Sequence, residues 1–122
     1  MKVKEAITLF QYYQRSSHKE RTTASYLHLL KKFESLHGER PFDSIEPDEI
    51  YHFLETFTEG LAKTSRRLRY AQLKAFYNFI ITRCSLNMKN PCNAPLLFKA
   101  FRMPKPVSRK ILDTRGTDTR GT

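Results

Sequence analysis

Residues 63–80 read KTSRRLRYAQLKAFYNFI and carry the longest helical pattern in the chain, which we expect to end near Arg83. Its apolar residues recur at the three- and four-residue steps of one helix face. The predicted inward face consists of Leu68, Gln72, Leu73, Phe76, Phe79 and Ile80. Roughly opposite, at spacings of four, three and four, lie Lys63, Arg67, Tyr70 and Lys74, with Arg66 and Arg69 beside the N-terminal end. The pattern predicts a helix with a basic exposed stripe.

Three further helices are predicted before this one. The first begins near Val3 and ends around residues 14–17, and the second runs from about Glu20 to His37, with Leu36 on its apolar face. The third begins at Pro47, a residue that suits the first helical turn, and Gly60 closes it. No convincing strand pattern is present. We therefore predict an all-α protein, a compact orthogonal four-helix bundle.

Charge is distributed unevenly along the 122 residues. The net charge is +10, but residues 1–60 hold 8 Lys/Arg and 10 Asp/Glu, whereas residues 61–122 hold 14 Lys/Arg and 2 Asp. No acid lies between Lys63 and Asp113, so the cations of the basic stripe have no i,i+4 partners. Clustered positive charge indicates a polyanion partner, most commonly nucleic acid, although an ordinary solvated helix face has the same composition.

A second candidate site lies at the start of the second predicted helix. Hydroxyl groups and free backbone N–H groups at a helix N-terminus suit phosphate binding. The residues concerned are Lys19, Arg21, Thr22, Thr23 and Ser25. N-capping by Thr22 or Thr23 explains the same residues equally well.

The sequence carries no pattern of an enzyme site. Cys84 and Cys92 are the only cysteines, and the four histidines lie at no metal-binding spacing. The acids Asp48 and Glu49 are explained by capping of a helix start. We therefore predict no catalytic residue, no metal and no cofactor. Because no apolar run of about 18 residues and no signal segment are present, we also expect no membrane contact and a cytoplasmic location.

The last part of the chain has a different character. Residues 96–101 are expected to form a short turn that packs on the body, and residues 103–107, MPKPV, read as an extended linker. The sequence DTRGT then occurs twice, at 113–117 and 118–122. We predict a domain at 1–102 and a linker with a disordered tail at 103–122.

The ordered set of motifs resembles the core-binding domain of the tyrosine recombinases, the phage-integrase family. The resemblance rests on Arg21-Thr-Thr-Ala-Ser-Tyr26 with Leu30 and Phe33, on residues 63–80, and on Asn90-Pro91 before the linker. It covers about residues 1–107 and implies a SAM-like four-helix domain that forms one jaw of a clamp around duplex DNA, in recombination or integration. Contacts implied by the resemblance are Thr22, Thr23, Lys63, Thr64, Arg66, Arg67 and Lys74.

The resemblance also sets limits. The family's catalytic Arg, Lys, His and Tyr residues lie in a C-terminal domain that would begin near residue 108 and has no counterpart here. We therefore expect double-stranded DNA as partner, other recombinase protomers bound with it on the DNA, and no small-molecule substrate. A protein-interaction module that uses residues 96–101 is the alternative, and a helix-turn-helix regulator ranks below both.

Overall fold

The computed structural model describes residues 1–17 and 19–101. The helices are α1 (Val3–Ser17), α2 (Glu20–His37), α3 (Pro47–Phe57), α4 (Lys63–Arg83) and α5 (Pro95–Phe101), with 3-10 turns η1 (Phe42–Ser44) and η2 (Pro91–Asn93). Among the described residues, β-type pairing is limited to one isolated bridge between Lys2 and Pro41. The all-α prediction and the four long helices are confirmed. Residues 96–101 form a helix rather than a turn.

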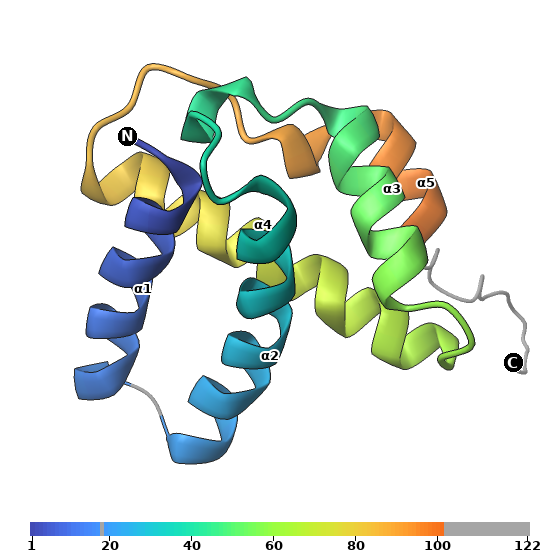
Figure 1. Ribbon diagram of the computed structural model, residues 1–122. Helices are drawn as coiled ribbons and strands as arrows, with labels where there is room; N and C mark the ends of the chain where they lie inside the picture. Colours follow the sequence, from blue (N-terminus) through green and yellow to red (C-terminus); the bar gives the residue numbers. More distant parts are fainter. Residues whose placement is uncertain (18, 102–122) are drawn as a thin grey trace, which may run out of the picture.

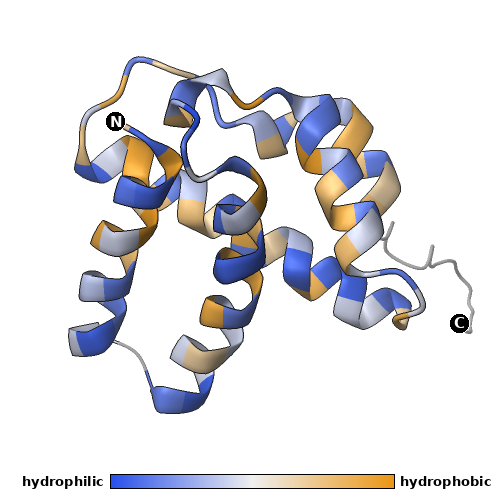
Figure 2. Cartoon of the chain, in the orientation of Figure 1, coloured by the Kyte–Doolittle hydropathy of each residue, from blue (hydrophilic) through white to orange (hydrophobic). Residues whose placement is uncertain are grey.

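The helices form two groups that α4 connects. α1 and α2 run side by side, α4 crosses behind them, and α3 lies beside α5 at the far end of α4 (Figure 1). Figure 2 shows the hydrophobic residues of α1 and α2 mostly on the sides turned inward, and hydrophilic residues where α1 ends and α2 begins. Because the helices cross rather than align, α4 has neighbours on several sides.

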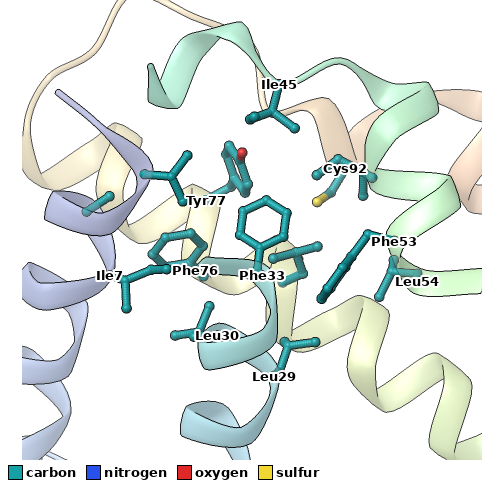
Figure 3. Packing of buried hydrophobic residues seen from close by; sticks show 14 of the residues in the cluster. Ile7, Leu29, Leu30, Phe33, Ile45, Phe53, Leu54, Phe76, Tyr77 and Cys92 are labelled. Carbon is teal, nitrogen blue, oxygen red and sulfur yellow. The ribbon is translucent and has the colours of Figure 1, made fainter. Parts of the chain in front are cut away.

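The core is built around aromatic side chains from α2, α3 and α4. Phe33 lies in the middle, with its ring centroid 5.0 Å from that of Phe53 and 6.4 Å from that of Tyr77 (Figure 3). Phe42 of η1 stacks on Tyr77 at 4.4 Å. Phe10 brings α1 against the same core through an edge contact with Phe76 at 5.5 Å. Burial of these large side chains is the main stabilising contribution, since each removes extensive apolar surface from water.

Two helix boundaries have a local cause in the sequence. Glu46 and Glu49 form a capping box at the start of α3, and Pro47 occupies the first turn, as predicted. After α3, Gly60 adopts a φ of 83°, a left-handed conformation that favours glycine and turns the chain into α4.

The start of α2 falls at Glu20, as predicted, but its N-cap is not a threonine. Lys19 is the N-cap residue and makes no side-chain capping bond, so Thr22 and Thr23 lie inside the first turn rather than capping it. Capping by either threonine, one of the two interpretations of these residues, is therefore wrong.

The inward face of two helices was also predicted partly wrongly. Leu68 of α4 is 51% exposed and Leu36 of α2 is 55% exposed. The predicted linker, tail and domain boundary at residue 102 lie outside the described residues. Within the described residues, none of the helices is long and apolar enough to cross a membrane.

Candidate nucleic-acid interface

The outward side of α4 forms a shallow groove of about 620 Å³. Opposite it, the buried side of the helix contributes core residues such as Leu73, Phe76 and Ile80. The groove is lined by Thr64, Arg67, Leu68, Tyr70, Ala71, Lys74, Ala75 and Asn78. Because all except Tyr70 follow the three- and four-residue steps of one helix face, these seven form a continuous strip of four turns, which we call the outer face of α4.

The outer face has a cationic edge and an apolar edge. On the cationic edge, Lys74 Nζ lies 4.9 Å from the ring centroid of Phe98, so this edge adjoins α5. On the other side of the helix, Gln72 Nε2 donates a hydrogen bond of 2.9 Å to Ser25 Oγ of α2. Leu68 is one helical turn from Gln72 and therefore lies on the edge nearer α2.

The two cations of the outer face, Arg67 and Lys74, have no acidic partner among the described residues. The described ion pairs involve Lys2, Lys4, Arg40 and Arg66, and none of them includes a cation of the outer face. Lys63 and Arg67 are exposed and Lys74 is half-buried. Uncompensated positive charge on one helix face produces a positive surface potential that attracts a polyanion.

Arg66, a predicted DNA contact, is occupied by contacts within the protein. Its guanidinium donates to Glu55 Oε2 at 3.3 Å and to Thr58 Oγ1 at 3.1 Å, both from the end of α3. It also lies 5.3 Å from the ring centroid of Phe101. Arg66 has no i,i+4 partner, as expected, but it has an acidic partner from another helix, Glu55.

Arg69, also predicted as a DNA contact, connects α4 to α2. Its Nη1 donates to Ser25 O at 2.9 Å, to Ser25 Oγ at 3.2 Å and to Gln72 Oε1 at 3.0 Å. The guanidinium lies 5.4 Å from the ring centroid of Phe57, and burial lowers its pKa from the ordinary value. Arg69 therefore holds the N-terminal half of α2 against α4, the two elements that carry both candidate sites.

Tyr70 was predicted on the exposed stripe, and this is wrong. The side chain is 3% exposed, and its hydroxyl donates a 2.6 Å hydrogen bond to the carbonyl of Cys92. Its ring stacks on Phe101 with centroids 6.2 Å apart. The physical reason is the packing of η2 and α5 against this side of α4, which the local periodicity does not contain.

The start of α2 presents the second candidate site. Lys19 and Arg21 are exposed, whereas Thr22 and Thr23 are half-buried. Thr22 precedes Ser25 by three residues, so it lies on the side of α2 that approaches α4. The uncapped helix N-terminus and two exposed cations suit binding of an anion.

The structure thus brings some of the predicted residues together and separates others. Thr64, Arg67 and Lys74 share the outer face of α4, and Lys63 begins the same helix. Sequence reasoning missed Leu68, Ala71, Ala75 and Asn78 as members of this face. The signal was present, since residues 64, 68, 71, 75 and 78 follow helical spacing, but Leu68 was assigned to the core because it is apolar.

These features define an all-α domain with a cationic helix face that is separate from its core. The family model described as phage integrase, N-terminal SAM-like domain, matches residues 7–83. Neither a curated protein nor a solved structure gives a significant match. Since the family model covers more than half of the chain, the chain belongs to the phage integrase N-terminal SAM-like domain family.

Proposed function

We propose that residues 1–102 bind duplex DNA as the core-binding domain of an integrase-like tyrosine recombinase. The observation that carries the proposal is the outer face of α4, where Arg67 and Lys74 have no acidic partner among the described residues. Cations on one face neutralise phosphates and release condensed counterions, which supplies sequence-independent affinity. Membership in an integrase family supports DNA rather than another polyanion.

Contacts are proposed from two elements. Lys63, Thr64, Arg67 and Lys74 of α4 would bind one stretch of backbone, and Lys19, Arg21, Thr22 and Thr23 at the start of α2 would bind another. Arg69 would act as a positioning residue, since its bonds to Ser25 link the two helices. Arg66 and Tyr70 are left out of the proposed contacts because their side chains bind α3 and η2.

The proposal covers binding and not strand cleavage. The match is to the N-terminal SAM-like domain of phage integrases over residues 7–83, and the proposal is confined to a role of that domain. We propose that the domain positions DNA for recombination together with other recombinase protomers on the same site. We also propose that it acts in the cytoplasm.

A protein-interaction module is the alternative function. Its expected surface at residues 96–101 is reduced in the structure, because Leu97 and Phe101 belong to the buried core, Phe98 is half-buried, and Leu96 is the one large apolar side chain of this segment that is exposed. An apolar interface and DNA binding differ in their response to salt, since only the second weakens steeply as ionic strength rises.

The first prediction concerns this salt response. We expect Arg67→Ala/Lys74→Ala to weaken binding to a mixed-sequence duplex and to reduce the slope of log K against log salt by about 1.8, roughly 0.9 for each lost phosphate contact. The measurement is fluorescence anisotropy of a labelled duplex from low to moderate salt. Lys31→Ala/Lys32→Ala, which removes the same charge from exposed positions of α2, should leave the slope close to that of the wild type.

Two results would contradict the proposal. Absence of binding to duplex at low salt would exclude DNA as the partner. Equal loss of slope in both double variants would mean that net charge, and not the outer face of α4, determines the affinity.

A further inference from the structure

The outer face of α4 contains an apolar strip beside its cations. Leu68 is 51% exposed, and Ala71 and Ala75 are exposed at the following turns on the same side. A single exposed leucine is ordinary on a protein surface. Here, however, three apolar residues follow one another between two cationic sites, the cationic edge of α4 and the start of α2. An anionic partner that binds both sites would cover the apolar residues between them.

Charge determines which partner fits this strip. Arg67 and Lys74 line the groove on one side, and Lys19 and Arg21 stand at the exposed start of α2 on the other. The sequence has no acid from Gly60 to Leu112. A partner that covers the apolar strip must therefore carry negative charge on its two flanks and apolar groups between them.

The major groove of DNA has this composition. It is about 12 Å wide, which admits an α-helix, and it is bordered by two phosphate backbones. The C5-methyl group of thymine is the apolar feature on its floor, and apolar side chains contact it. The small side chains of Ala71 and Ala75 would allow the helix backbone to approach the base edges closely, while Leu68 reaches further.

We propose that Leu68 contacts pyrimidine C5-methyl groups in the major groove and makes binding depend on them, while the small side chains of Ala71 and Ala75 allow the helix to approach the bases. This inference rests on the proposed DNA binding and adds the chemical group that the domain recognises. Leu68 is the specificity-determining residue, and the cations of α4 supply affinity that does not depend on sequence. Thymine and 5-methylcytosine carry the same methyl group at the same position, so both are recognised.

The experiment uses the full chain and one mixed-sequence duplex prepared in four forms, with thymine or uracil and with cytosine or 5-methylcytosine. We expect the affinity to fall about fourfold for each contacted methyl that uracil removes, and to rise again with 5-methylcytosine. Leu68→Ala should reduce these ratios to about one and keep the salt slope of the wild type. Leu36→Ala, which truncates an equally exposed leucine on α2, should keep the methyl dependence.

The outcomes separate this inference from the function on which it rests. Binding with the expected salt slope but equal affinity for all four duplexes overturns the methyl contact and leaves DNA binding intact. A thymine effect without a 5-methylcytosine effect assigns the preference to duplex shape and overturns the contact. Methyl dependence that persists in Leu68→Ala overturns the role of Leu68. Absence of binding to every duplex overturns both proposals.

Discussion

At the scale of single residues, the phenol of Tyr70 connects the middle of α4 to η2. Its hydroxyl donates to the carbonyl of Cys92, which is fully buried together with its thiol, and burial raises the pKa of that thiol to about 12. A buried carbonyl that loses its donor retains the cost of desolvation. Tyr70 is therefore a structural residue beside the cationic edge of the face that is proposed to bind DNA.

We predict that Tyr70→Phe lowers the free energy of unfolding by about 1 to 2 kcal/mol, because it removes one buried hydrogen bond and leaves an acceptor unsatisfied. The measurement is urea unfolding followed by circular dichroism. Affinity for duplex DNA at temperatures where the variant is folded should equal that of the wild type. Tyr12→Phe, at a side chain that is 64% exposed, is the matched control and should change neither quantity. Weaker DNA binding with unchanged stability would contradict this prediction and would mean that Tyr70 contacts DNA.

Tyr70 and Leu68 also show why the sequence predicts the existence of α4 better than its orientation. Both are large and partly apolar, and they lie two residues apart on different sides of the helix. Local periodicity marks both sides as possible core, and only the positions of α5 and η2 decide between them. Arg66 and Arg69 are similar cases, since their partners Glu55, Thr58 and Ser25 belong to other helices. The exposed cations Lys63 and Arg67, which make no such contact, were located correctly.

At the scale of elements, Glu49 stabilises the start of α3 in two ways. Its Oε1 accepts a 2.9 Å hydrogen bond from the backbone N–H of Glu46, and its carboxylate forms an ion pair with Arg40. The hydrogen bond from Arg40, followed by the bond from Glu46, lowers the pKa of Glu49 from its ordinary value. A lowered pKa means that the folded state stabilises the ionised carboxylate. This contribution is therefore present above about pH 4.5 and is lost as the pH falls through the folded-state pKa.

We predict that Glu49→Gln is less stable than the wild type by about 0.5 to 1 kcal/mol at pH 7, and that the difference becomes smaller as the pH is lowered to 3. Glutamine keeps the oxygen that the capping box needs, removes the charge, and places an NH2 group where Glu49 Oε2 accepts from Arg40. Urea unfolding at both pH values measures the two differences. Glu59 is an exposed acid that belongs to none of the described ion pairs, so Glu59→Gln should have the same free energy of unfolding as the wild type at both pH values. If Glu49→Gln and the wild type differed in free energy of unfolding by the same amount at pH 7 and pH 3, the charge of Glu49 would contribute nothing to stability.

The elements themselves were largely predictable. Helical spacing and the start and stop residues located the four long helices, and Pro47 and Gly60 located the limits of α3 closely. The start of α2 at Glu20 was also predictable, but its cap was not, because a Thr-rich first turn resembles a capping sequence, whereas the structure has Lys19 as the N-cap. A short helix such as α5, with 7 residues, is stabilised by packing rather than by its own propensity, so its pattern is weak.

At the scale of the whole molecule, residues after α4 complete the core although they lie beyond the family match. Leu97 of α5 is fully buried, Phe101 is 3% exposed, and Asn90 donates a 2.8 Å hydrogen bond to Asn78 of α4. α5 packs against both α3 and α4. Each buried Leu or Phe contributes about 1.5 to 3 kcal/mol, and a whole domain has about 5 to 15 kcal/mol of net stability.

We predict that a chain ending at Arg83 does not unfold cooperatively in urea, because it lacks Cys92, Leu97 and Phe101, whereas a chain ending at residue 102 unfolds with the midpoint of the full chain. Circular dichroism and the steepness of the urea transition measure both. The shorter chain should retain helical signal without a sharp transition. A cooperative transition of the 1–83 chain at the full-length midpoint would show that α5 does not stabilise the core. The proposed domain boundary would then move from residue 102 to residue 83.

The separation of the two sides of α4 has a consequence for how the family can diversify. Residues such as Leu73 and Phe76 are constrained by packing, since a change of one methylene there alters the fit of the core. Leu68, Ala71 and Ala75 lie on the other side, where substitutions usually change stability by less than about 0.5 kcal/mol. Mutation can therefore alter the outer face while leaving the scaffold intact. On the proposed DNA binding, a lineage that keeps the buried side of this helix and varies the exposed side would gain new target sites without having to evolve a new fold.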